Sequence, residues 1–430
     1  MMHAVRKSGT ALAIFLAGAL MAASANAAGF ALFEHGAKAM AMGGAFTAQA
    51  DDGSAFFFNV AGLAFQRERS FTIGTTFITS EGEYRGLDPF PGRTARGEME
   101  PLAEIPSHLY YIHPFGERTT FGLGVYTPFG LSTEWKNKPT FAGRYLSVLA
   151  SLRTFDINPT VAFQVTPQLA LGIGAIARVS DVKLQRYAGT QNPFTQQVVN
   201  IAKVDLESDF DTGYGFNVGL LHKVNPSFSW GLSYRSAIDI DYEGDARFTQ
   251  ISTGFPQLDA AVQRMLPFGS AVPVETAIGF PETWSLGFAF TLSPSFVVEV
   301  DANRTGWSSF DRLPMTFTTV PQLSSVVVED WEDVNTYRIG FQWTTSPTWQ
   351  WRFGYLYDES PQPDTTVGPL LPDSDRHGFS VGFGHRGQRF QTDLAFLYLP
   401  FKNRCTTSNH DNFYACYETT AYLFGATLSF

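Results

Sequence analysis

From Ser70 to the end of the chain, apolar and polar residues alternate with a period of two in a series of short runs. The run Trp349–Asp358 is typical, because every second residue is aromatic and most residues between them are polar. Its aromatic positions are Trp349, Trp351, Phe353, Tyr355 and Tyr357. Such alternation predicts β-strands with two unlike faces. A face of aromatic residues suits lipid better than water, as in the strands of membrane barrels.

Three further runs follow the same pattern: Phe228–Glu243, His377–His385 and Thr420–Phe430. In the first of them we expect one continuous strand, with Trp230, Ile238 and Ile240 on the same face. The last run ends on the aromatic residue Phe430. A terminal aromatic residue is the usual mark of outer-membrane barrels, whose last strand is read by the assembly machinery.

The segments between the runs are of two kinds, which alternate along the chain. Short turns lie at Gly116-Glu117, Thr166-Pro167, Asn225-Pro226, Ser293-Pro294, Ser346-Pro347 and Gly387-Gln388. Long connections lie near residues 82–104, 129–152, 186–209, 244–282, 304–334, 359–376 and 401–418. Six turns and seven long connections make thirteen links, which join fourteen strands. An even number of strands with short turns at one end and long loops at the other is typical of bacterial outer-membrane barrels, whose short turns lie in the periplasm. We therefore predict an all-β fold, a 14-stranded antiparallel transmembrane β-barrel over residues 70–430.

Composition agrees with this class, since only 16% of residues are charged against roughly 25% in soluble domains. Residues 1–27 predict a secretory signal peptide, in which Arg6 and Lys7 precede an apolar run and an A-x-A site at Ala25 and Ala27. An uncleaved anchor helix is the alternative, although the run is short for a membrane span. The net charge of −10, without a basic cluster, argues against a nucleic-acid partner.

Residues 28–69 form the only long part of the mature chain that lacks alternation, and Ala, Gly and Phe dominate them. Fourteen strands enclose a lumen too wide for wall side chains to fill. We therefore expect residues 28–69 to fold into the lumen as a plug, or hatch. An arm in the periplasm is the alternative.

Several stretches resemble the FadL/TodX-type outer-membrane transporters of hydrophobic compounds. They are the mature start AGF, YRSAIDIDYEG (234–244), GWSSFDRL (306–313), and YLYDESPQPD with LPDSDRH (355–377). The resemblance implies a fourteen-stranded barrel closed by an N-terminal hatch. It also implies an outer apolar groove, an inner apolar pocket, and lateral release through the wall at a kinked strand. The family usually has Asn-Pro-Ala at the end of the hatch, where this chain has Asn59, Val60 and Ala61 without the proline.

The resemblance also points to residues near the ligand. Phe30 matches the family residue beside the inner pocket, and we expect it to contact ligand or to block the pocket until the hatch shifts. Phe33 is a second candidate of this type, and simple space filling is the alternative for both. Gly122 and Gly124 of the third strand face the lumen, where a hatch must pack closely. In the family this strand carries the lateral opening.

Two long connections carry apolar residues. In residues 129–144, Leu131, Trp135 and Phe141 predict an exposed apolar capture surface, and packing of the loop on itself is the alternative. In residues 244–282 the spacing predicts a short amphipathic helix that caps the barrel. Its apolar positions are Leu258, Val262, Met265 and Leu266.

A fatty-acid carboxylate in an apolar pocket needs a cation, because a buried charge must be paired. Arg144, Arg178 and Arg186 are candidates by their positions near the upper lumen. Ordinary pairing with lumen acids such as Asp156 or Asp181 is the alternative for each of them.

The two cysteines, Cys405 and Cys416, lie close together in an exported chain. A disulfide is the expected state in that compartment. The spacing matches no usual zinc site, so we predict neither metal nor cofactor.

The function that fits best is passive outer-membrane transport of hydrophobic molecules. Long-chain fatty acids are the favoured cargo, and alkanes or monoaromatic hydrocarbons are the alternative. An enzyme is disfavoured because no H-E-x-x-H motif is present and because the one G-x-S-x-G match, GFSVG (378–382), lies inside the alternating run His377–His385 instead of forming a strand-to-helix elbow. A polar porin is disfavoured because an apolar plug would serve no purpose there. The expected partners are lipopolysaccharide, outer-membrane lipid and, through Phe430, the barrel assembly machinery, and we expect a monomer in the bacterial outer membrane.

Overall fold

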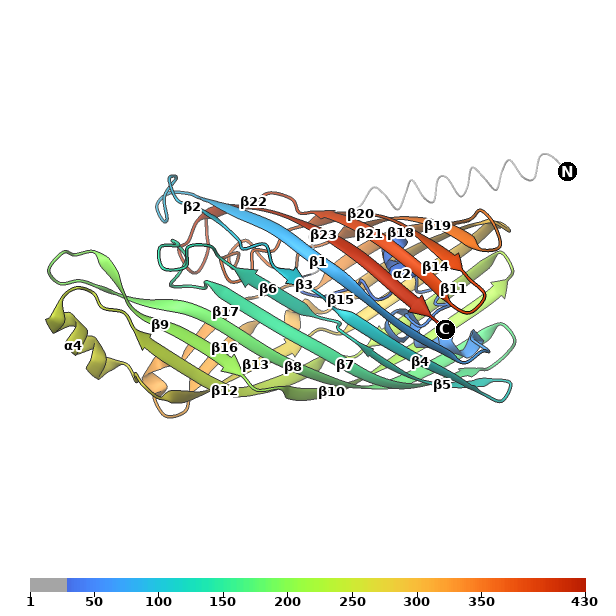
Figure 1. Ribbon diagram of the computed structural model, residues 1–430, viewed down its shortest axis with the longest axis horizontal. Coiled ribbons are helices and arrows are strands. Elements are labelled where there is room, and N and C mark those ends of the chain that lie inside the picture. The colour runs from blue at the N-terminus through green and yellow to red at the C-terminus, as the bar shows by residue number, and fades with distance from the viewer. Residues whose placement is uncertain (1–28) are drawn as a thin grey trace.

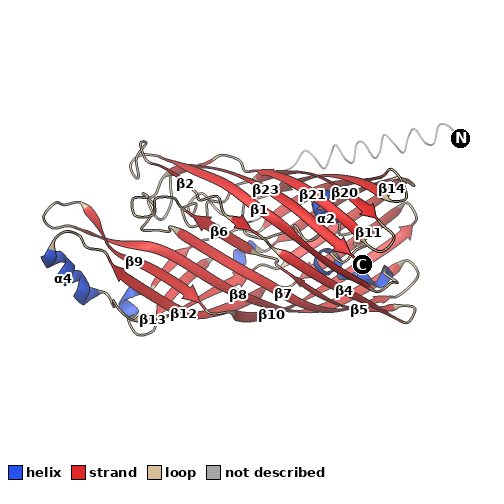
Figure 2. Cartoon of the chain, viewed as in Figure 1, coloured by secondary structure: helices blue, strands red, loops and turns tan. Residues whose placement is uncertain are grey.

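A computed structural model describes residues 29–430, so the predicted signal peptide and Ala28 lie outside the described residues. The described chain is all-β and forms one closed antiparallel barrel of 14 wall strands, as predicted (Figures 1 and 2). The wall strands are β1 (Ser70–Gly86), β4 (Ser107–Phe115), β5 (Thr119–Tyr126), β7 (Leu149–Gln164), β8 (Leu169–Gln191), β10 (Asp211–Asn225), β11 (Phe228–Arg235), β14 (Thr283–Ser293), β15 (Phe296–Thr305), β18 (Val334–Thr344), β19 (Trp349–Asp358), β20 (Arg376–Arg386), β21 (Gln391–Pro400) and β23 (Ala415–Ser429).

The barrel closes because its first strand pairs with its last. The ladder between β1 and β23 runs without interruption from Thr72 opposite Ser429 to Gly86 opposite Ala415. A closed sheet has no unpaired edge, which is why barrels can stand in lipid.

The two faces of the wall differ as the alternation predicts. In β19 the side chains of Trp349, Trp351 and Phe353 are exposed on the outside, whereas Arg352 is fully buried on the lumen side. Arg352 donates to Asp393 of β21, at 2.7 Å, so the lumen-facing charge is paired. The outside of the barrel is therefore apolar and its inside is polar.

The predicted turns are present at one end of the barrel, and the other end carries the long loops (Figure 1). These loops contain nine further strands: β2 (Arg96–Glu98), β3 (Ala103–Glu104), β6 (Gly130–Glu134), β9 (Val198–Ser208), β12 (Ile238–Gln250), β13 (Ala271–Phe280), β16 (Arg312–Phe317), β17 (Ser325–Val328) and β22 (Arg404–Thr406). They also contain α4 (Pro256–Met265) and the 3₁₀ helices η2 (Trp307–Ser309) and η3 (Pro321–Leu323). No helix within residues 29–430 combines the length and the apolar character needed to cross a membrane.

The predicted helix in residues 244–282 is confirmed as α4, with Val262 buried and Met265 exposed. Its predicted position is wrong, because α4 lies at the tip of the β12–β13 hairpin, far beyond the wall, and does not cover the barrel mouth (Figure 1).

The expected single strand over Phe228–Glu243 is also wrong. The strand is interrupted at Ser236 and Ala237, between β11 and β12. Strand β12 pairs with β9 and β13 and not with a wall strand. Ile238 and Ile240 are therefore buried, 1% and 2% exposed, rather than facing outward with Trp230. Two residues outside the ladder leave the alternation in the sequence unchanged, so the pattern alone did not reveal this break.

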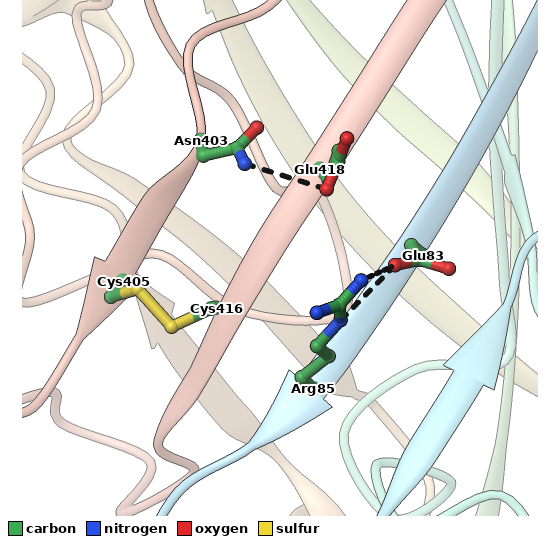
Figure 3. The surroundings of a disulfide bond; sticks show 6 residues. All are labelled: Glu83, Arg85, Asn403, Cys405, Cys416 and Glu418. Carbon is green, nitrogen blue, oxygen red and sulfur yellow. Dashed lines mark hydrogen bonds and ion pairs between the residues drawn. A yellow bond between two sulfur atoms is a disulfide. The ribbon is translucent and has the colours of Figure 1, made fainter.

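The predicted disulfide joins Cys405 of β22 to Cys416 of β23 (Figure 3). The two residues face each other in the antiparallel register. The disulfide therefore fixes a long-loop strand to the last wall strand.

Candidate functional site

The N-terminal segment, residues 29–69, lies inside the barrel (Figure 1). It contains α2 (Ala37–Ala41), α3 (Ala55–Phe58) and the 3₁₀ helix η1 (Val60–Phe65). Most residues from Phe30 to Ala64 are buried. Its small residues allow the backbone to approach the wall closely, and a Cβ at Gly354 of β19 would collide with the backbone of Gly43.

Lumen-facing polar side chains hold the backbone of this segment in place. Such partners are needed because buried backbone groups outside regular structure must still be hydrogen-bonded. On the acceptor side, Asp301 of β15 accepts from the amides of Phe46 and Thr47, both at 2.9 Å. Three donors act on backbone carbonyls of the segment: Arg338 on Gly43, at 2.9 Å, Arg235 on Phe57, at 3.1 Å, and Asn217 on Phe56, at 3.2 Å.

The Asn59–Val60–Ala61 motif lies at the start of η1, where the N-terminal segment contacts wall strand β10. The Asn59 side chain accepts from the Ala61 amide, at 3.1 Å, and so caps η1. Val60 takes the first helical position, where proline is favoured because the amide there has no partner within the helix. The helix start is thus kept without the proline.

Phe30 lies at the centre of an aromatic cluster, and it is 5% exposed. Its ring centroid lies 4.6 Å from that of Trp307, 5.3 Å from that of Phe310 and 5.5 Å from that of Trp331. Phe129 and Phe280 complete the cluster, at 6.0 and 6.3 Å. We call these six residues the Phe30 cluster.

Phe33 lies deeper in the lumen. Its ring is 5.6 Å from that of Phe57, and the Arg338 guanidinium lies over it at 4.4 Å. Beside it is a cavity of about 30 Å³, lined among others by Ala31, Phe33, Phe57, Phe129 and Arg235. That volume holds no more than about one water molecule, so the inner pocket is closed in this structure.

The wall is interrupted beside Phe30. Strand β5 ends at Tyr126, and β6 begins at Gly130. The N-terminal segment pairs with the chain at this break, where Leu32 donates to the Pro128 carbonyl, at 2.9 Å, and Gly130 donates to the Phe30 carbonyl, at 3.1 Å. The segment that carries Phe30 thus covers the break from the lumen side.

Gly122 and Gly124 face the lumen in the same strand, as predicted. A Cβ at either position would collide with the ring of Phe56 in α3. These glycines seat the N-terminal segment, while the interruption itself lies several residues farther along, at residues 127–129.

The loop residues chosen as a capture surface have different positions. Trp135 is 0% exposed and Phe141 is 5% exposed. Their rings stack at 4.7 Å, and Trp135 Nε1 donates to the Pro369 carbonyl, at 2.9 Å. The expectation of an exposed surface is therefore wrong for these two residues, because loops at the barrel mouth pack over them. Leu131 is partly buried and packs against the larger apolar cluster that contains Phe30.

The three candidate arginines differ in their partners. Arg178 forms a buried ion pair with Asp156, at 2.8 Å. Arg144 donates to Asn200, at 2.7 Å, and to the Phe141 carbonyl, at 2.9 Å. Arg186 forms no ion pair and no side-chain hydrogen bond with any residue in the described part of the chain. Pairing within the protein therefore accounts for Arg178 but leaves Arg186 free.

Arg186 lines a cavity of about 330 Å³ at the long-loop end, which we call the outer cavity. Its other lining residues come from several loops and include Ser147, Leu184, Leu206, Leu313, Met315, Val327, Glu329, Pro369, Leu370, His410 and Asp411. Leu184, Leu313, Val327 and Leu370 also belong to, or pack against, the apolar cluster that contains Phe30. The outer cavity and the Phe30 cluster thus form one continuous apolar region.

The sequence did not single out Trp307, Phe310, Trp331 or Glu329. All four lie in the connection between β15 and β18, which folds into the barrel mouth. Glu329 is 3% exposed, and burial raises its pKa to about 8. Trp307 and Phe310 lie in the GWSSF stretch (306–310), whose resemblance to the family could have indicated these two residues. No sequence pattern indicated Glu329 or Trp331.

Comparison with known proteins gives a consistent result. The sequence profile of one family, described as outer membrane protein transport protein (OMPP1/FadL/TodX), matches residues 18–430. The long-chain fatty acid transport protein of Escherichia coli O6:H1 is 25% identical over 396 residues, which cover 87% of this chain and 86% of that protein.

Two solved structures share the fold. A FadL homologue from Pseudomonas aeruginosa superimposes with a TM-score of 0.82 at 19% identity, covering 94% of this chain and 99% of that one. The toluene transporter TodX of P. putida has a TM-score of 0.70 at 18% identity, covering 92% and 97%. Both likenesses concern the barrel architecture.

Proposed function

The chain belongs to the outer membrane protein transport family (OMPP1/FadL/TodX), and we propose that it carries long-chain fatty acids passively across the bacterial outer membrane. Membership places the barrel in the outer membrane and makes it a transporter of hydrophobic molecules. The proposed cargo rests on the relatives whose names describe long-chain fatty acid transport proteins.

One observation supports the route. An apolar region runs from the outer cavity through the Phe30 cluster to Phe129, which stands at the break after β5. In our proposal the outer cavity captures the molecule, and the Phe30 cluster and the pocket beside Phe33 receive it. Leu131 borders the passage, while Trp135 and Phe141 support the loops around it. Release is lateral, through the wall at residues 127–129, once the N-terminal segment has moved.

The N-terminal segment is the gate in this proposal. It fills the lumen, and its pairing with Pro128 and Gly130 covers the break in the wall. A shift of residues 30–32 would uncover the break and open the inner pocket in one movement. Asn59, Val60 and Ala61 then form the fixed end of the gate, and Gly122 and Gly124 form its seat.

Uptake of monoaromatic hydrocarbons or alkanes is the second candidate. The aromatic walls of the Phe30 cluster would accept a neutral ring as readily as an acyl chain. We infer no enzymatic activity, since the chain belongs to a transporter family. We also propose that the protein is a monomer, that lipopolysaccharide surrounds it, and that the barrel assembly machinery recognises its last strand through Phe430.

The test measures uptake of radiolabelled oleate and of toluene by cells that lack their own transporter, with and without this protein. Oleate uptake that requires the protein supports the fatty-acid proposal, and uptake of toluene alone moves the assignment to hydrocarbons. If neither compound enters, the transport proposal fails.

The same cells carrying a variant without residues 28–69 test the gate. We expect the deletion to admit small sugars while the barrel remains correctly assembled. Unchanged sugar permeability would show that the segment does not close the lumen.

A further inference from the structure

Arg186 lines the outer cavity and has no ion-pair partner among the described residues. Its side chain is partly buried, and none of the acids among residues 29–430 lies within ion-pair distance of it. The other inward-facing arginines described above, Arg178, Arg235, Arg338 and Arg352, each pair with an aspartate. An unpaired guanidinium away from water is costly, because charge loses its hydration there.

A second polar group without a partner lies on the same wall. The Ser147 hydroxyl is buried and has no hydrogen-bond partner in the described chain. Two backbone hydrogen bonds, both 2.8 Å long, join Val148 to Gln185 and Tyr187 to Arg144, so that residues 144–148 run beside residues 185–187. Ser147 and Arg186 therefore lie on adjoining segments, and both line the outer cavity.

The remaining walls show what kind of molecule fits beside this polar pair. Leu184, Leu206, Leu313, Met315 and Val327 give one side of the cavity an apolar lining, while polar residues such as Gln362, Thr366 and His410 also line it. Two acids also line the outer cavity, Glu329 and Asp411. Glu329 has no ion-pair partner among the described residues, and Trp331 Nε1 donates to it at 3.0 Å. Burial raises the pKa of Glu329 to about 8, so Glu329 is mostly uncharged at neutral pH and does not repel an anion. Burial also raises the pKa of Asp411 above its ordinary value.

We propose that Arg186 and Ser147 form the head-group site of the outer cavity, and that they select carboxylic acids with apolar tails over neutral hydrocarbons. This inference rests on the proposed transport function and specifies its substrate class. A guanidinium binds a carboxylate through two parallel hydrogen bonds. A hydroxyl beside it supplies a third donor, and the tail lies along the leucines toward the Phe30 cluster.

The test compares three probes of equal chain length: dodecanoate, its methyl ester and dodecane. Each is titrated calorimetrically into the purified full-length protein in an uncharged detergent at pH 7. Charge-assisted hydrogen bonds predict a Kd for the acid about tenfold lower than for the ester. Arg186→Gln should remove this difference and leave ester binding unchanged, whereas Arg186→Lys should keep part of it. Lys183→Gln is the matched control, because Lys183 lies on the same strand and is already paired with Glu207.

The inference is overturned if acid and ester bind the unaltered protein equally well, or if Arg186→Gln weakens both to the same extent. Should Arg186→Gln fail to assemble, dodecanoate labelled with ¹³C at the carboxyl carbon tests the unaltered protein. The bound acid should titrate at a lower pH than the free acid, and an equal or higher value contradicts an Arg186 contact. Failure of all three probes to bind would instead contradict the proposed transport function itself, and the head-group site with it.

Discussion

The side-chain amide of Asn59 donates to the Leu220 carbonyl of wall strand β10, at 3.0 Å. The same amide donates to the Thr47 carbonyl of the N-terminal segment, at 2.9 Å. Asn59 therefore joins two parts of the segment to the wall with one buried group. These two hydrogen bonds anchor the fixed end of the proposed gate.

Replacing Asn59 should loosen the plug. Asn59→Ala leaves two buried carbonyls without their donor, and each loss costs about 1–3 kcal/mol. We expect a correctly assembled barrel that leaks small sugars in a liposome-swelling assay. Asn403→Ala is the control, because the exposed Asn403 side chain donates to Glu418 of β23 and forms no hydrogen bond with the N-terminal segment in the described chain (Figure 3). An unaltered leak rate in Asn59→Ala would show that this contact does not hold the plug.

A side chain at Gly124 should also displace the plug. Its Cβ would lie 2.9 Å from Cβ of Phe56, closer than side-chain atoms normally approach. We expect Gly124→Val to push α3 from the wall, to cost about 1–3 kcal/mol as overpacking does, and to expose the N-terminal segment to protease. Leu123→Val, on the outward face of the same strand, is the matched control. Equal protease resistance in both variants would argue against a close seat at Gly124.

Much of the fold could be predicted because lipid and lumen impose opposite chemistry on alternate residues. Trp349, Trp351 and Phe353 report this directly, and the turns between such runs gave the correct number of strands. The break at Ser236 and Ala237 escaped prediction because a two-residue interruption preserves parity.

The site was less predictable, since it is assembled by loops distant in sequence. In the sequence Trp135 resembles an exposed loop residue, but in the structure it is buried and donates to the Pro369 carbonyl of a distant loop. Three arginines in similar positions could not be ranked from the sequence, because only spatial pairing shows that Arg178 has Asp156 while Arg186 has no acid. Tertiary contacts of this kind leave no periodic signal.

Loop packing at the barrel mouth should weaken as pH rises. The folded-state pKa of Glu329, about 8, lies above its ordinary value of 4.5, so the folded state holds this proton more tightly than the unfolded loop does. The resulting stabilisation is complete below pH 4.5 and is lost as pH rises toward and through 8. The negative charges of the neighbouring acids Asp330 and Asp411 also raise the pKa of Glu329.

Fluorescence of Trp331, which donates to Glu329, reports this change. Between pH 6 and 9.5 we expect its emission to shift to longer wavelength as the loop opens. Glu329→Gln keeps a hydrogen-bond acceptor without the titration, so the shift should disappear in this variant. A shift that persists in Glu329→Gln would assign the transition to another group.

The disulfide should protect the loop that it closes. Cys405 and Cys416 are separated by 11 positions, and the chain-entropy relation gives about 3 kcal/mol for a loop of this length. In the double variant Cys405→Ser, Cys416→Ser we expect faster proteolysis within residues 401–414 and unchanged barrel migration on unheated gels. Reductant added to the unaltered protein should reproduce the effect, and equal cleavage in all samples would contradict it.

Truncation of Phe30 should convert the closed cluster into a binding site for a small ring. The ring touches five aromatic neighbours, with Trp307 at 4.6 Å, so Phe30→Ala leaves an apolar cavity at a cost of about 3–5 kcal/mol. Cavities lined in this way stay dry and accept apolar molecules of similar size. Calorimetric titration with toluene should show binding to Phe30→Ala that is at least about tenfold tighter than to the unaltered protein. Phe390→Ala, which removes an exposed outward ring, is the control. Weaker toluene binding in Phe30→Ala would mean that the Phe30 ring contacts the ligand directly instead of occupying its place.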